Sequence, residues 1–222
     1  MTNTLLSAQN FLSALPEEIP VYPLSGVLLL PQARLPLNVS EPHDRTMIED
    51  ALGKGRLIGM IQPTTEDDVD NPPLYSVGCA GRITSFNEID DGHLLIVLTG
   101  LCRFRVLSEM PRVRLYRTVK PEWTPYLADL GETDPALIDR DRLIELMRIY
   151  FKKNSISVDW SVVKNAPDDI LLPTIIMICP FAPNEKQALL EAKNFAARAE
   201  MLVALLEMAA MPQRENEAEM RH

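Results

Sequence analysis

The sequence predicts an α+β protein, with a β-rich first half followed by a bundle of helices that ends in a long helix. Up to about residue 120, apolar residues occur in short runs separated by turn residues, which is typical of many short strands in a barrel-like or sandwich-like sheet. After Pro125 the apolar spacing changes to every third or fourth residue, as in helices. The 18 prolines, against 9 glycines, are expected at the ends of these segments, because proline is costly inside strands and helices.

Short strands are expected throughout the first half. Asp90-Asp91-Gly92 is typical of a hairpin turn between two of them. The expected strands are residues 19–24, 26–30, 34–39, 57–61, 75–86, 93–98, 101–107 and 113–119. One helix interrupts this series, because Pro42 suits a first helical turn, the apolar residues of 47–52 share one face, and Gly53 ends the pattern.

The second half is predicted to be helical. Asp134-Pro135 is typical of a helix start, and the apolar residues that follow at 143–150 lie on one face. A helical turn is expected at 160–164, and an apolar helix at 168–179. The final helix is expected to begin at Asn184, which has capping-box spacing to Gln187, and to run for roughly 26 residues.

Charge and cysteine content narrow the class of protein. The net charge is −9, and an acidic chain disfavours nucleic acid or anionic lipid as the main partner. Cys79, Cys102 and Cys179 stand in apolar surroundings without metal or redox spacing, so free thiols in a reducing compartment are expected. Neither a basic signal sequence nor a membrane-length apolar run is present near the start, which predicts a soluble cytoplasmic protein.

The candidate binding residues are four arginines in a locally basic band. Residues 100–120 carry six basic side chains and one acidic one. Alternation in a strand places Arg103 and Arg105 on one face, and Arg112 and Arg114 repeat the pattern in the next strand. Four guanidinium groups on one face could hold a carboxylate-bearing peptide or a phosphate. The alternative is a solvated face paired with the acidic parts of the chain.

No catalytic, metal or cofactor site is expected. Ser161 and Lys164 match the S-x-x-K spacing of a serine nucleophile and its lysine, but the supporting S-D-N and K-T-G elements are missing. We therefore interpret the pair as a non-catalytic match. The acidic segment 66–70 lacks the glycine and closing glutamate of a calcium loop. His43 and His93 have no second metal ligand at a suitable spacing.

Several stretches, taken in order, resemble one known family. They are Ile19-Pro-Val-Tyr-Pro-Leu24, Leu30-Pro-Gln-Ala-Arg-Leu-Pro-Leu37, Leu74-Tyr-Ser-Val-Gly-Cys-Ala-Gly81, Leu98-Thr-Gly-Leu-Cys-Arg-Phe-Arg-Val106 and Glu185-Lys-Gln-Ala-Leu-Leu-Glu191. Together they are similar to the amino-terminal substrate-binding domain of Lon proteases. The resemblance covers about residues 17–211 and implies a PUA-like pseudo-β-barrel followed by a helical bundle. It also implies recognition of unfolded segments or partner proteins. In this family the ATPase and the serine–lysine protease are separate modules.

The resemblance leads to the following expectations. No phosphate-binding loop occurs, and 25.0 kDa leaves no room for an ATPase and a protease, so a stand-alone bacterial form of the domain is expected. The expected parts are an N-terminal arm (1–18), a PUA-like barrel (19–125), a helical bundle (126–211) and a disordered tail (212–222). The expected function is non-catalytic binding of an unfolded peptide or of a partner protein such as a protease or chaperone. The alternative is a small-ligand-binding or nucleic-acid-binding role, and the oligomeric state stays open.

Overall fold

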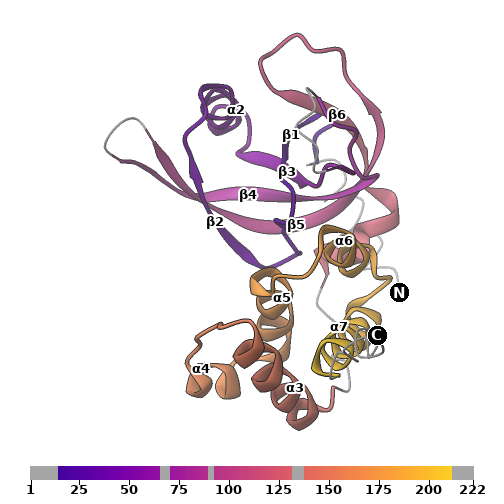
Figure 1. The fold of residues 1–222 in the computed structure, drawn as a ribbon. Coiled ribbons are helices and arrows are strands. Elements are labelled where there is room, and N and C mark those ends of the chain that lie inside the picture. The colour runs from indigo at the N-terminus through magenta and orange to yellow at the C-terminus, as the bar shows by residue number, and fades with distance from the viewer. Residues whose placement is uncertain (1–14, 66–70, 90–92, 132–137, 212–222) are drawn as a thin grey trace, which may run out of the picture.

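The computed structural model describes residues 15–65, 71–89, 93–131 and 138–211 (Figure 1). Six strands precede almost all of the helical structure. The strands are β1 (Ile19–Pro23), β2 (Arg34–Val39), β3 (Leu57–Ile61), β4 (Val77–Glu88), β5 (Leu94–Glu109) and β6 (Arg117–Glu122). The helices are α2 (Pro42–Leu52), the 3-10 helix η2 (Thr124–Leu130), α3 (Arg140–Lys153), α4 (Trp160–Asn165), α5 (Asp168–Ile178), α6 (Pro183–Glu191) and α7 (Phe195–Ala210).

Five of the strands close into a ring. β4 pairs with β5 and with β3, β3 pairs with β1, β1 pairs with β6, and β6 pairs back onto β5. Only the β1–β3 pair is parallel among these described pairings. β5 is 16 residues long, so its first half also pairs with β2 while its second half closes the ring with β6. The predicted α+β class, with a pseudo-barrel followed by helices, is confirmed.

Four of the expected strands differ from the structure. Residues 26–30 form no strand, and Leu28, Leu29 and Leu30 are buried as an irregular segment. The runs 93–98 and 101–107 belong to one strand, because the chain stays extended through Gly100, whose N–H donates to the carbonyl of Ala33. The last strand begins at Arg117 rather than at 113, and residues 110–116 form a loop between β5 and β6.

Most of the expected helices are present. α2 begins at Pro42, ends before Gly53 and buries Met47, Ile48 and Ala51. The helical turn at 160–164 and the apolar helix at 168–179 correspond to α4 and α5. The expected helix start at 134–135, the turn at 90–92, the acidic segment 66–70 and the tail 212–222 lie outside the described residues.

The single long helix predicted after Asn184 is wrong. The chain leaves helical geometry at Ala192 (φ −50°, ψ 134°), and α7 begins after Asn194, whose side-chain oxygen accepts from the N–H of Ala197. α6 itself begins one residue earlier than predicted, and the capping partner is Glu185, whose carboxylate accepts from the N–H of Ala182. No described helix is long and apolar enough to cross a membrane.

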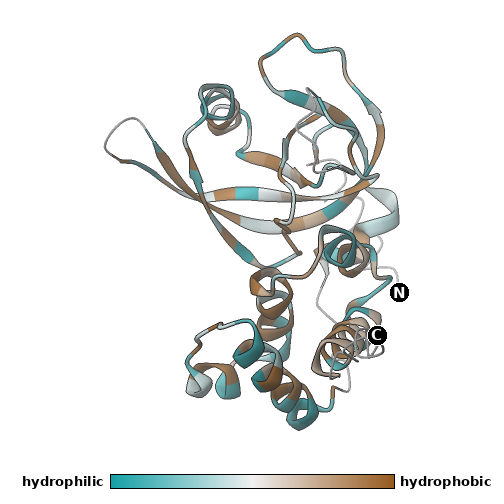
Figure 2. Cartoon of the chain, viewed as in Figure 1, coloured by the Kyte–Doolittle hydropathy of each residue, from teal (hydrophilic) through white to brown (hydrophobic). Residues whose placement is uncertain are grey.

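The barrel and the helices share one hydrophobic core. Buried side chains of β2, β4 and β5 belong to the same contact cluster as those of α3, α5, α6 and α7, and Leu28–Leu30 lies between them. Figure 2 shows hydrophobic residues along α5 and along the strands of the sheet. A smaller cluster around Phe104 and Trp123 fills the part of the barrel near β1 and β6. The helical part is therefore packed on the barrel by apolar burial, the main favourable term in folding.

Buried polar side chains fix α6 to the barrel. Gln62 donates to the carbonyl of Pro183 (3.0 Å) and to the side chain of Gln187 (3.1 Å), and Gln187 donates to the carbonyl of Val77 (3.0 Å). Lys186 donates to the carbonyl of Gly26 (2.7 Å). Because buried polar groups are costly when unpaired, these bonds favour one placement of α6 over others.

Candidate functional site

The four candidate arginines do not form one exposed face. Arg103 is 4% exposed, and its guanidinium pairs with both carboxylate oxygens of Asp129 (2.8 Å each). It also donates to the carbonyls of Leu190 (3.0 Å) and Ala192 (2.7 Å) and stacks on the ring of Tyr126, 4.7 Å from its centroid. The expectation that Arg103 is open to a ligand or to solvent is wrong, because η2 and the end of α6 cover this part of β5.

The other three arginines are exposed. Arg105, two residues further along β5, lies beyond this cover and pairs with Glu122 of β6 (3.2 Å). Arg112 and Arg114 belong to the loop 110–116 and not to a strand, so the expected strand alternation does not apply to them. The structure therefore brings Arg112 and Arg114 together in one loop and separates them from Arg103.

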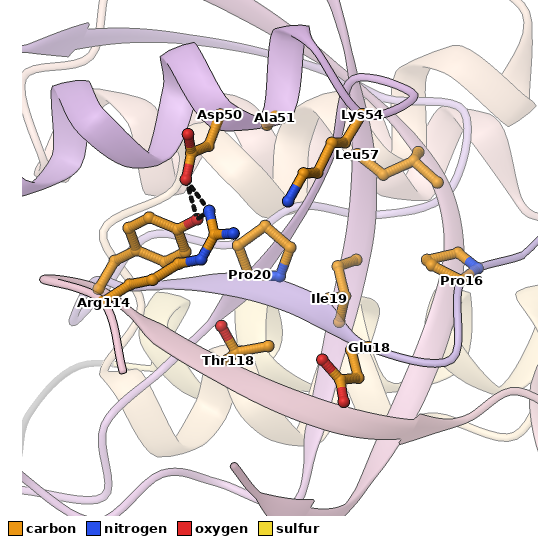
Figure 3. A pocket seen from close by; sticks show the side chains of 11 residues that line it. Pro16, Glu18, Ile19, Pro20, Asp50, Ala51, Lys54, Leu57, Arg114 and Thr118 are labelled. Carbon is orange, nitrogen blue, oxygen red and sulfur yellow. Dashed lines mark hydrogen bonds and ion pairs between the residues drawn. The ribbon is translucent and has the colours of Figure 1, made fainter. Parts of the chain in front are cut away.

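A pocket of about 210 Å³ lies on one side of this loop (Figure 3), and we call it the Lys54 pocket. Asp50 of α2 accepts hydrogen bonds from Arg114 and from the hydroxyl of Tyr116. Lys54 extends over Pro20 in Figure 3 and forms no ion pair with a described residue. Buried Ile19, Ala51 and Leu57 supply apolar lining. The pocket combines an apolar base with the ammonium group of Lys54 and the carboxylates of Glu18 and Asp50.

A second pocket, of about 240 Å³, lies on the other side of Tyr116, and we call it the His43 pocket. His43 Nε2 lies 3.3 Å from Asp44 Oδ1, and Arg112 and Leu115 contribute from the loop. Burial raises the pKa of Asp44, and burial together with the nearby Asp44 carboxylate raises the pKa of Tyr22 to about 12. Tyr22 is therefore a neutral hydroxyl at neutral pH.

The loop also exposes apolar side chains between its arginines. Val113 is 90% exposed and Leu115 is 65% exposed. Tyr116 is buried and separates the two pockets, and its hydroxyl also accepts from Arg114 (2.7 Å). Val113 and Leu115 with the two adjacent pockets form what we call the loop surface. Exposed apolar groups beside cationic side chains are suited to binding a polypeptide.

Sequence reasoning missed Asp50, Lys54 and Tyr116. Asp50 lies in the last turn of α2, and Lys54, four residues later, directly follows its C-cap Gly53, so both are at the same end of the helix. That spacing is visible in the sequence, but nothing in it shows that Tyr116, 66 residues after Asp50, hydrogen bonds to it.

Ser161 and the three cysteines, considered for catalysis or metal binding, have a structural role or are buried. Ser161 donates through its hydroxyl (2.6 Å) and its backbone N–H (2.8 Å) to Asp159, the N-cap of α4. The thiols of Cys79, Cys102 and Cys179 are free and buried, and burial raises the pKa of all three. Raised pKa values leave little reactive thiolate. Among the described residues, no cluster of three or more His, Cys, Asp or Glu could hold a metal ion.

A family model matches most of the chain. Residues 18–208 match the model described as the ATP-dependent protease La (LON) substrate-binding domain. This range contains every strand of the ring, α2 and the loop 110–116.

Comparisons with individual proteins agree with the family match. The chain is 28% identical over 209 residues to Lon protease 2 of Sorangium cellulosum, covering 86% of this chain and 24% of that protein. It is 26% identical over 191 residues to a Lon protease of Flavobacterium johnsoniae, covering 83% of this chain and 23% of that protein. The chain thus spans about a quarter of the length of these curated relatives.

Two solved structures share the fold. One is described as a crystal structure of a Lon N-terminal domain protein from Xanthomonas campestris, with a TM-score of 0.55 and 22% identity, covering 84% of this chain and 97% of that chain. The other is the N-terminal domain of a Mycobacterium avium complex Lon protease, with a TM-score of 0.60 and 15% identity, covering 86% of this chain and 98% of that chain.

Proposed function

Because the chain belongs to the ATP-dependent protease La (LON) substrate-binding domain family, we propose that it is a non-catalytic module that binds unfolded peptide segments or partner proteins. The match covers the substrate-binding domain, and the ATPase and protease activities of the full-length relatives are not carried over to it. A partner with protease or chaperone activity fits this role. We further propose a cytoplasmic location, which the three free thiols support.

The observation that carries this proposal is the loop surface. Val113 and Leu115 are exposed apolar side chains with a pocket on each side of the loop that bears them. An apolar side chain of a bound segment would enter the Lys54 pocket, where Lys54 can pair with a carboxylate. Arg112 and Arg114 remain binding candidates at the rim of this surface. Arg105 remains an exposed candidate on β5, and Arg103 has a structural position.

The proposal is tested with fluorescein-labelled, unfolded casein as the probe and fluorescence anisotropy as the measurement. We expect the wild-type chain to bind the probe and Val113→Ser/Leu115→Ser to weaken binding at least tenfold, because about 1.4 kcal/mol of apolar contact is then lost. The matched control is Ile170→Ser/Met208→Ser, which changes two similarly exposed apolar side chains on α5 and α7. Equal weakening by both pairs, or no binding by the wild type, contradicts the proposal.

The alternative is a small-ligand or nucleic-acid role for the exposed arginines. It predicts that single-stranded RNA binds with an affinity that falls steeply as salt is added, because phosphate contacts release counterions. Arg112→Ala/Arg114→Ala should then abolish RNA binding. The net charge of −9 and the burial of Arg103 favour the peptide proposal over this alternative.

A further inference from the structure

A separate pocket of about 410 Å³ lies on the helical part of the molecule, between the second half of α3 and the start of α4. In Figure 1 these helices lie at the end of the molecule away from the loop between β5 and β6. The pocket is thus distinct from the loop surface. Its lining includes Arg148 and Lys152 of α3, residues 155–158 and Trp160.

The lining of this pocket is basic in an acidic protein. Arg148 and Lys152 lie one helical turn apart, and none of the lining residues is acidic. Neither side chain forms an ion pair with a described residue. The guanidinium of Arg148 stacks 4.7 Å from the ring centroid of Trp160. A stacked guanidinium keeps its N–H edges available for a carboxylate.

The segment that connects α3 and α4 presents an open backbone to the same pocket. The N–H of Ile156 donates to the carbonyl of Phe151, but Ser157 and Val158 take no part in a backbone–backbone hydrogen bond with any described residue. Their exposure alternates, with Ser155 and Ser157 exposed and Ile156 and Val158 half-buried. An extended peptide laid beside this segment can satisfy the open N–H and C=O groups.

From the charge, the stacked arginine and the open backbone, we propose that this pocket binds an extended segment of a partner protein in which acidic and apolar residues alternate. A carboxylate of the segment pairs with Arg148 and Lys152, and a neighbouring apolar side chain packs on Ile156 and Val158. The class of ligand, a polypeptide segment, rests on the proposed function. The site itself is separate from the loop surface. Asp159 does not line the pocket, and its carboxylate is held by Ser161.

The test titrates the full chain with a blocked eight-residue peptide in which glutamate alternates with valine, and follows tryptophan fluorescence. Trp160 is half-buried at the pocket whereas Trp123 is buried in the barrel, so the expected change arises from Trp160 and is lost in Trp160→Phe. Arg148→Gln/Lys152→Gln should weaken binding at least tenfold. The matched control Lys120→Gln/Lys193→Gln removes two exposed charges elsewhere and should leave the affinity unchanged.

Three outcomes would overturn the inference. They are equal binding of the same peptide with glutamine in place of glutamate, equal weakening by the control pair, and preferential binding of single-stranded oligothymidylate. Far-ultraviolet circular dichroism checks that the glutamine variants remain folded. Failure of this inference alone leaves casein binding intact and sensitive to Val113→Ser/Leu115→Ser, whereas failure of the proposed function leaves no casein binding that is sensitive to Val113→Ser/Leu115→Ser and does not affect peptide binding here.

Discussion

At the scale of single residues, Arg103 joins the two parts of the molecule. Its guanidinium holds Asp129 of η2 and the carbonyls of Leu190 and Ala192 at the end of α6, and it is almost wholly buried. Burial of a charge is tolerated when the charge is paired and its donors are satisfied, as they are here. Arg105, two positions away, has the same chemistry but an exposed ion pair, and exposed pairs contribute little to stability.

We predict that Asp129→Ala destabilises the protein strongly. The change leaves the Arg103 guanidinium buried without its counter-charge, which typically costs about 3–5 kcal/mol. The free energy of unfolding, measured by urea titration, should fall by that amount. Glu122→Ala, which removes the exposed partner of Arg105, is the matched control and should cost no more than about 1 kcal/mol. Similar losses in both variants would show that Arg103 is not held as described.

At the scale of elements, the segment 26–30 differs most from its expected form. Its apolar run is typical of a strand, yet it packs as an irregular segment against β5. The close approach depends on Gly100: a Cβ built there would lie 1.9 Å from the carbonyl oxygen of Leu30. The N–H of Gln32 also donates to the carbonyl of Gly100 (2.9 Å). A backbone contact this close is possible only where one partner has no side chain.

We predict that Gly100→Ala displaces this segment from β5. The added methyl group meets backbone rather than a flexible side chain. The free energy of unfolding should therefore fall by at least the amount that one extra methylene in a packed core typically costs, about 1–3 kcal/mol. Urea titration and hydrogen exchange of residues 28–33 measure the effect. Gly131→Ala is a suitable comparison, since its nearest described neighbour would lie at an ordinary 3.5 Å. An unchanged midpoint for Gly100→Ala would contradict the packing described for Leu30.

At the scale of the whole molecule, buried titratable groups make the free energy of unfolding depend on pH in the alkaline range. Burial raises the pKa of Cys102 and of Cys179 from 9.0 to about 12, and it also raises the pKa of Cys79. A raised folded-state pKa contributes stability that is present below pH 9.0 and is lost as the pH rises toward 12. Lys186 acts in the opposite sense, because burial lowers its pKa. Burial and the charge of Arg103 lower the pKa of Arg198 to about 10. Arg198 therefore offsets the loss of stability caused by the thiols mainly above that pH.

We therefore predict that the free energy of unfolding falls between pH 9 and pH 10. Three thiols lose protons only in the unfolded chain, and each net proton corresponds to about 1.4 kcal/mol per pH unit. Urea titrations under reducing conditions at pH 8, 9 and 10 measure the slope. Cys179→Ala should lower stability at every pH but make the slope shallower by up to about 1.4 kcal/mol per pH unit. A slope that Cys179→Ala does not change would contradict the raised pKa of this thiol.

The sequence by itself determined that a strand-rich first half with one helix is followed by a helical second half, the bounds of α2, α4 and α5 within a few residues, and the apolar surroundings of the cysteines. These features depend on local spacing and on the residues at segment ends, which the sequence contains directly. The tertiary structure alone decided that Arg103 is buried and that two pockets flank Tyr116. Each depends on contacts between distant residues, such as Arg103 with Leu190, 87 positions away, and no local pattern records such a contact.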